Sequence, residues 1–132
     1  LTRGNFQEGD ERLDDGNSAP LRHAAPFFTD THLIFRNQKL EADLFVNYNA
    51  EVSFNNLPPS ERADVHLHAL DKNGNPFTPS WYTLNLRTQY KLTPKITLGA
   101  NIENITDQLY RTFSSGISAP GRNYIFSVKA VL

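Results

Sequence analysis

Two histidines two positions apart, His66 and His68, are the residue pair whose type and spacing come nearest to metal chemistry. In an extended segment, residues i and i+2 lie on the same face, so the two imidazoles could bind one metal or a haem iron. The sequence places no third ligand beside them, and the chain has no Cys to supply a thiolate. A solvated loop with two histidines is the simpler interpretation. We therefore predict no metal site and keep His66 and His68 as candidate ligand-binding residues.

Two groups of acidic residues could also be taken for chemical sites. The Asp and Glu side chains of residues 10–15 could bind calcium, but their spacing lacks the alternating ligands and the distal Glu of a calcium loop. Glu41, Asp43 and Glu51 share one face of an extended strand, where charges that face a polar space need no catalytic role. The sequence contains no glycine-rich phosphate loop and no nucleophile elbow. We expect no catalytic residue, no cofactor and no enzyme activity.

The overall composition narrows the possible classes of protein. With 132 residues the chain has room for about one domain. Its 13 Lys and Arg nearly balance its 14 Asp and Glu, which excludes a strongly basic nucleic-acid binder. No apolar stretch approaches the roughly 18–20 residues of a helical membrane span. The low mean hydropathy is nevertheless compatible with a transmembrane β-barrel, because half of each barrel strand faces a polar interior.

Alternation of apolar and polar residues is the main structural signal. From Leu40 to Phe54 every even position is apolar, and all the odd positions except Phe45 are polar. This period of 2 predicts a strand well beyond the usual 5–6 residues and long enough to cross a membrane obliquely. Other segments repeat the pattern more weakly, and we predict five strands and no helix. The predicted strands are 27–36, 40–54, 82–92, 96–103 and 124–132.

The connections between these segments differ in length according to the end of the predicted sheet at which they lie. Residues 37–39 and 93–95 form tight turns at one end of the predicted sheet. Long connections at 55–80 and 105–122, rich in Pro, Gly, Asn and Ser, lie at the other end, and the irregular residues 1–26 join them as an extracellular loop. Outer-membrane barrels have this layout. Five strands cannot close a barrel, so we expect further strands and a plug domain upstream.

Residues 76–132 carry several strings at regular spacing. Pro76 precedes Pro79-Ser80-Trp81-Tyr82-Thr83-Leu84-Asn85-Leu86, then Asn101-Ile102-Glu103-Asn104-Ile105-Thr106-Asp107, then Tyr110-Arg111, and finally Ser115-Gly116-Ile117-Ser118-Ala119-Pro120-Gly121-Arg122-Asn123. Together these strings resemble the C-terminal barrel segment of TonB-dependent outer-membrane receptors, especially those of Bacteroidetes-like bacteria. The residues before 76 fit that family more loosely.

The strings also contain residues to which we assign a structural role. Asn and Asp accept local backbone hydrogen bonds where a strand becomes a loop, and glycine permits a positive φ. Aromatic side chains near strand ends are typical of the girdle of a membrane barrel. The residues to which we give such roles are Trp81, Asn101, Asn104, Asp107, Tyr110, Gly121 and Arg122.

The resemblance implies an all-β fold, the last part of a 22-stranded antiparallel transmembrane barrel in the bacterial outer membrane. It implies TonB-dependent uptake of a scarce ligand such as a siderophore, haem, cobalamin or an oligosaccharide. The expected partners are membrane lipid, the rest of the barrel, a plug domain, the TonB complex and a small extracellular ligand, with no nucleic acid. The alternative from another class is a soluble β-sandwich that binds a ligand or carbohydrate.

Overall fold

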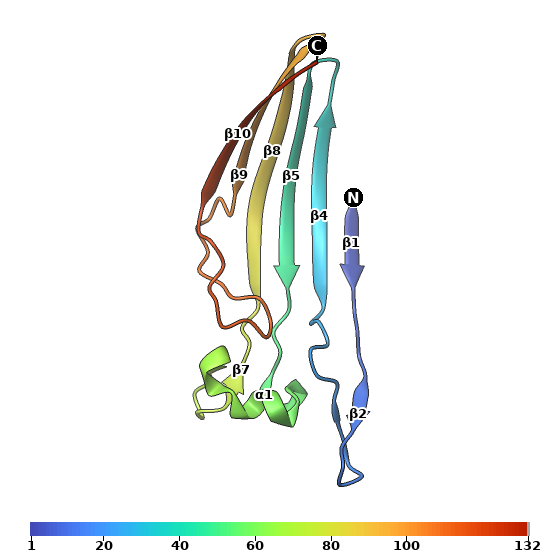
Figure 1. Cartoon of the computed structure of the whole chain (residues 1–132), viewed down its shortest axis with the longest axis vertical. Coiled ribbons are helices and arrows are strands. Elements are labelled where there is room, and N and C mark those ends of the chain that lie inside the picture. The colour runs from blue at the N-terminus through green and yellow to red at the C-terminus, as the bar shows by residue number, and fades with distance from the viewer. Residues whose placement is uncertain (132) are drawn as a thin grey trace.

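A six-stranded antiparallel sheet dominates the computed structural model, which describes residues 1–131. Neighbouring strands follow the order β1-β4-β5-β8-β9-β10, and β1 and β10 form its two open edges (Figure 1). The strands of this sheet are β1 (Thr2–Asn5), β4 (Phe28–Arg36), β5 (Leu40–Asn49), β8 (Trp81–Thr93), β9 (Ile96–Glu103) and β10 (Asn123–Ala130). The protein is therefore all-β and antiparallel, as its alternating sequence predicts.

The two faces of the sheet differ in chemistry because partners across an antiparallel ladder share a face. Leu44 lies opposite both Leu33 and Leu86, Leu86 lies opposite Ile102, and Ile102 lies opposite Tyr124. One apolar row thus crosses all five long strands. We call this side the apolar face.

The other side, the polar face, carries hydrogen-bonding and charged groups. Asn47 lies opposite both Asp30 and Thr83, and four residues away along β5 Asp43 lies opposite Arg87. The Asn47 side-chain amide donates to the Asp30 carboxylate at 2.6 Å. The segregation of residue types predicted from odd and even positions is therefore present in the sheet.

The hydrophobic core does not lie on the sheet. Among residues 1–131 the buried hydrophobic side chains are Ala19, Val52 and Leu57, and all three lie outside the six-stranded sheet. On the apolar face, by contrast, Phe126 is 79% and Leu33 is 72% exposed. Contiguous exposed apolar surface of this kind marks a face that contacts another protein or a membrane.

The longest alternating run does not form a single strand, so the prediction of a strand over 40–54 is wrong in its length. β5 ends at Asn49; the Ala50 N–H then donates to the Phe27 carbonyl, and Val52 pairs with Thr78 in an isolated bridge. Alternation continues past the strand because Val52 is buried against the irregular segments. The other four long strands agree with prediction within two residues, and Leu132, expected in the last one, lies outside the described residues.

Residues 1–26 contain more regular structure than the loop that we predict. β1 pairs with β4 from Thr2↔Thr31 to Asn5↔Phe28, and β2 (Asp10–Arg12) pairs with β3 (Ser18–Pro20) in a separate hairpin. β1 shows no alternation because most of its side chains are exposed, and its pairing satisfies backbone groups rather than burying side chains. The edge at residues 27–37 is therefore partly covered.

The long connection after β5 holds short helices, which corrects the prediction of none. They are η1 (Phe54–Asn56), α1 (Pro59–Ala63) and η2 (Val65–Leu67), and a small hairpin of β6 (Ala69–Leu70) and β7 (Pro76–Phe77) follows. Pro59 stands at the first position of α1, where its missing N–H costs nothing. A five-residue helix is too short to display a 3.6-residue period.

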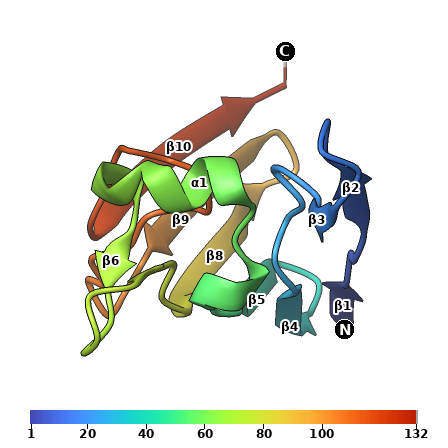
Figure 2. The same cartoon turned by 90° about the horizontal axis from the view of Figure 1, so that it is seen from below.

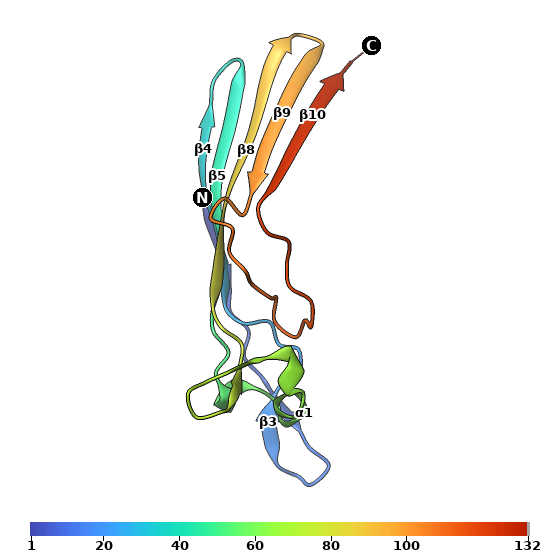
Figure 3. The same cartoon turned by 90° about the vertical axis from the view of Figure 1, so that its left-hand side faces the viewer.

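The long connections collect at one end of the sheet and the tight turns at the other (Figure 1). Seen along the strands, α1 lies across that end of the sheet (Figure 2), and the segment between β9 and β10 runs toward it (Figure 3). Within residues 1–131, no helix has the length and apolar character needed to span a membrane. The long-connection end is where the segments meet that could form a site.

Candidate functional site

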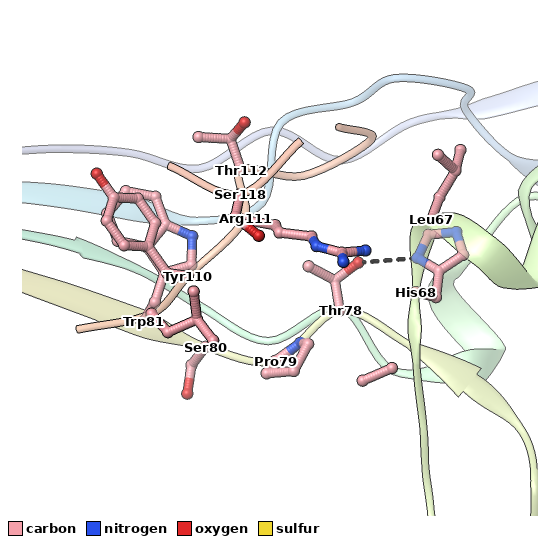
Figure 4. Close-up of a pocket in the computed structure, with 12 residues that line it drawn as sticks. Leu67, His68, Thr78, Pro79, Ser80, Trp81, Tyr110, Arg111, Thr112 and Ser118 are labelled. Atoms are coloured by element: carbon pink, nitrogen blue, oxygen red, sulfur yellow. Dashed lines mark hydrogen bonds between the residues drawn. The ribbon is translucent and has the colours of Figure 1, made fainter. Parts of the chain in front are cut away.

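A cavity of about 320 Å³ opens where the two long connections meet the start of β8 (Figure 4). It is lined by residues 67–69, 78–81 and 109–112 together with Ser118. Its walls therefore come from both predicted long connections, 55–80 and 105–122. We refer to it as the loop cavity.

Two aromatic rings form one wall of the loop cavity. The rings of Trp81 and Tyr110 stack with centroids 4.2 Å apart and an interplanar angle of 30°. Trp81 is the first residue of β8 and lies opposite Asn49, so it projects from the polar face, whereas the next residue, Tyr82, belongs to the apolar face. Trp81 and Tyr110 thus stack on each other on the side of the polar face, while Tyr82 lies on the apolar face; a place in an aromatic girdle stays a prediction for all of them.

The two predicted histidines lie in this region but do not act as a pair. Residues 65–67 form the 3-10 helix η2, so the extended backbone that would place both imidazoles on one face is absent at this point. His66 is exposed, while His68 Nδ1 and Thr78 Oγ1 are hydrogen-bonded at 3.1 Å and line the cavity. The His68 Nε2 atom is buried without a hydrogen-bond partner among the described residues.

The cavity also holds a positive charge that the sequence did not single out for binding. Arg111 Nη1 donates to the carbonyl oxygen of His66 at 3.3 Å and so bridges the two long connections. Ser80 and Ser118 belong to the same lining, which contains no Asp or Glu among the described residues. A guanidinium and a stacked pair of aromatic rings are groups that can contact the polar and planar parts of a small molecule.

Tyr110 differs electrostatically from an exposed tyrosine. Burial raises the pKa of its phenol above the ordinary value, and the negative charge of Glu103 adds to this shift. Both effects oppose ionisation of the ring. The cavity therefore presents a neutral phenol over a wide pH range.

The Asn and Asp residues of the strings close the second long connection. Asn104 is 3% exposed and has φ 49°; its side-chain amide donates to the Gln108 carbonyl at 2.9 Å and its oxygen accepts from the Gln108 N–H at 2.9 Å. Asp107 has φ 54° and accepts from the Arg122 backbone N–H. Their predicted function in local backbone bonding is seen directly in these contacts.

The structure gives details of Gly121 and Asn101 that the sequence did not predict. The φ of Gly121 is not positive, contrary to our expectation; a Cβ there would instead meet Asp107 Oδ1 at 2.6 Å. A larger residue at position 121 would therefore displace the Asp107 carboxylate. Asn101 lies on the polar face of β9, opposite Arg87 and Ile125.

A buried polar network on β8 was not anticipated. The Asn85 side-chain amide donates to Asn47 Oδ1 at 2.9 Å, while Asn85 Oδ1 accepts from the Asn104 backbone N–H at 2.9 Å. Asn85 is 5% and Thr83 is 4% exposed. The only sequence signal was that these residues occupy polar positions of the alternation. The network ties the end of β9, and with it the second long connection, to the middle of the sheet.

Three of the acidic candidates, Glu11, Glu41 and Asp43, have structural partners. Glu41 pairs with Arg36 at 3.1 Å, and Asp43 lies 3.0 Å from His32 Nδ1. In the first segment, Glu11 pairs with Arg22 at 2.9 Å. No group of three or more His, Asp or Glu in residues 1–131 is arranged to hold a metal ion.

Comparisons with known proteins give a structural likeness only. The sequence matches no protein-family model and no curated protein. A solved structure with a similar fold is the copper transporter OprC, with a TM-score of 0.68 and 18% sequence identity. The match covers 89% of this chain and 18% of that one, so this chain spans less than a fifth of the transporter's length. The all-β architecture described above is shared with part of that protein.

Proposed function

We propose that the chain forms the C-terminal wall of a TonB-dependent receptor that takes up a scarce small ligand across the bacterial outer membrane. In this proposal the five long strands belong to a 22-stranded barrel, and the function is transport rather than catalysis. The strings in residues 76–132 support the family, and the similar fold of a transporter supports the general function.

The observation that carries this proposal is the exposed apolar face. It runs across five strands of 8–13 residues, and a tilted membrane strand needs about 9–11. Tyr48 and Tyr82 lie opposite each other on this face at the long-connection end, the position of an interfacial aromatic belt. A lipid bilayer would cover this face, while the polar face would line the barrel interior.

The open edges and the loop cavity complete the proposal. Backbone groups at the free edge of β10 would pair with a further strand of the same barrel, since an unpaired edge invites aggregation. The loop cavity would lie on the extracellular side and contribute to ligand capture, with a plug domain and the TonB complex acting through other parts of the protein. Loops on a rigid scaffold are where binding residues concentrate.

Membrane fractionation of the full-length protein tests the proposal. We expect it in the outer-membrane fraction, with a gel mobility that changes on heating and with extraction only by detergent. Recovery in the soluble fraction without detergent would contradict it and favour the β-sandwich alternative.

The role of the loop cavity needs a separate measurement. We expect Trp81→Ala to weaken uptake of the cognate ligand in a panel of copper, ferric siderophore, haem, cobalamin and oligosaccharide, at unchanged surface levels. Tyr82→Ala is the matched control, because it removes a neighbouring aromatic ring from the other face. Equal uptake by both variants would place ligand capture elsewhere in the protein.

A further inference from the structure

Three lysines form a row across the polar face at its tight-turn end. Lys91 lies four residues beyond Arg87 on β8 and therefore on the same face; it lies opposite Thr97, which in turn lies opposite Lys129. On the other side of Lys91, its backbone N–H donates to the Lys39 carbonyl at 2.8 Å, which places Lys39 directly opposite it. Partners across an antiparallel ladder share a face. We call Lys39, Lys91 and Lys129 the lysine row.

The lysine row concentrates positive charge that the described chain does not neutralise. All three side chains are exposed, and none of the ion pairs within 4.0 Å among residues 1–131 involves a lysine. Like charges directly opposite each other destabilise a sheet, and Lys39 and Lys91 form such a pair. Contacts among residues 1–131 therefore leave this repulsion uncompensated.

The acidic side chains on the same face of the sheet already have partners. In the row next to the lysine row, the Glu41 carboxylate pairs with Arg36 at 3.1 Å. Farther from the turns, the acidic side chains have polar partners within 3.3 Å: Asp43 with His32, Asp30 with Asn47, and Glu103 with Asn123. The carboxylates of this face are thus engaged away from the lysine row.

The lysine row points away from the apolar face. The adjacent row, one residue nearer the middle of the sheet, consists of Leu40, Tyr90, Leu98 and Val128. Successive residues of a strand point to opposite sides, so this apolar row and the lysine row are on different faces. Lysines that bind lipid headgroups lie along the border of the membrane-facing surface. A protein segment that packs on the polar face fits the position of the lysine row better than a lipid does.

We propose that the lysine row docks an acidic protein segment on the polar face at its tight-turn end. Lys39 and Lys91 are neighbours and can share one carboxylate, which converts their repulsion into two attractions. Lys129 is two strands from Lys91, about 10 Å away, and needs a second carboxylate. The partner is therefore a segment with at least two Asp or Glu side chains on one side. That the rest of the same full-length protein supplies this segment rests on the proposed function.

Carbodiimide cross-linking of the full-length protein in non-ionic micelles tests this docking, because the reagent joins an ammonium group to a carboxylate without a spacer. Mass spectrometry of the digested protein identifies the linked peptides. We expect Lys91 and Lys129 to be linked to Asp or Glu outside residues 1–132. The links should be lost at 1 M salt, where the Debye length is about 3 Å. Lys72, an exposed lysine between β6 and β7 at the other end of the molecule, should form no such link.

A charge reversal within the row gives a matched pair of variants. Lys91→Glu places a negative charge beside the docked carboxylates, so the yield of the Lys129 link should fall at least about threefold. Lys72→Glu makes the same change in charge away from the row and should leave that yield unchanged. Equal yields of the Lys129 link in the two variants would overturn the proposal.

The rate of amine acetylation in the wild-type protein tests the same contact without a mutation. In micelles free of anionic lipid, Lys91 should react at least about threefold more slowly than Lys72, as expected for an ammonium held in an ion pair. Reaction as fast as that of Lys72, or cross-links that run only to carboxylates inside this chain, would contradict the docking. Protection that requires added phosphatidylglycerol would assign the row to lipid instead. Recovery in the soluble fraction would contradict the proposed function alone, since the cross-links report the docking separately.

Discussion

Asp107 and Arg122 are joined by a hydrogen bond that closes the second long connection, residues 105–122. Asp107 Oδ1 accepts a hydrogen bond from the Arg122 backbone N–H at 2.8 Å, and Arg122 Nε donates to the Ile105 carbonyl at 2.9 Å. Residues 105–122 therefore begin and end at one point. This closure brings Tyr110 and Arg111 back over the start of β8, where they line the loop cavity.

Gly121→Ala should break this closure. A Cβ at position 121 would lie 2.6 Å from Asp107 Oδ1, so the carboxylate must leave the Arg122 N–H. We expect a loss of about 1 kcal/mol in the free energy of unfolding, measured by reversible denaturation in micelles. Gly9→Ala is the control, since its nearest contact would be an ordinary 3.6 Å. Equal losses in both variants would contradict the steric explanation.

The stack of Trp81 on Tyr110 should appear as a coupling energy. In a double-mutant cycle of Trp81→Ala and Tyr110→Ala, we expect the two changes to be non-additive by about 0.5–1.5 kcal/mol, as for other aromatic pairs. The same cycle with Tyr82→Ala in place of Trp81→Ala should give additive effects, because Tyr82 projects from the other face. Additivity in the first cycle would exclude the stack.

Titration of Tyr110 should reflect its burial and the charge of Glu103. Both raise its pKa above the ordinary 10.0, so the folded protein retains a proton that the unfolded chain releases. The contribution of Tyr110 to stability is therefore complete below pH 10 and is lost as the pH rises through the raised pKa. The ultraviolet difference between wild type and Tyr110→Phe measures the midpoint, and Glu103→Gln should lower it. A midpoint at or below 10.0 would contradict this account.

A charge on the apolar face should be far more costly than one on the polar face. Leu86→Arg should destabilise the assembled barrel by roughly 2–4 kcal/mol, the cost of Arg near the middle of a bilayer. The natural Arg87, one residue away, lies on the polar face, with its guanidinium 5.3 Å from the Phe45 ring centroid. Gln89→Arg, on the same side as Arg87, is the control and should change little. Heat-dependent gel mobility measures the fraction of folded barrel in each variant. A similar loss of folded barrel in both variants would contradict the assignment of the two faces.

The long strands and their two faces could be predicted because one side of the sheet carries apolar side chains and the other carries polar ones. Leu44, Leu86 and Ile102 lie in one apolar row across the sheet. Because successive residues of a strand point to opposite faces, such a row appears in the sequence as an alternation of apolar and polar residues. The closing function of Asn104 and Asp107 was also predictable, since short polar side chains bond to nearby backbone where strands end.

What the sequence could not show depends on contacts between distant segments. β1 forms through backbone pairing with β4, which leaves no side-chain pattern. Trp81 stacks on Tyr110, and Glu61 meets His23 and Ser114, only because three connections converge at one end of the sheet. For the same reason His68 lines the loop cavity while His66, two positions away, is exposed.

Lipid contact along β8 tests the central claim most directly. The chain has no Cys, so single cysteines at positions 82–90 of the full-length protein, with any cysteines outside this chain removed, can each carry a fluorophore in reconstituted vesicles. We expect lipid-borne quenchers to reach the even positions, such as Leu84 and Leu86, and to spare the odd ones, such as Asn85 and Arg87. Quenching that shows no alternation would contradict a membrane-facing wall.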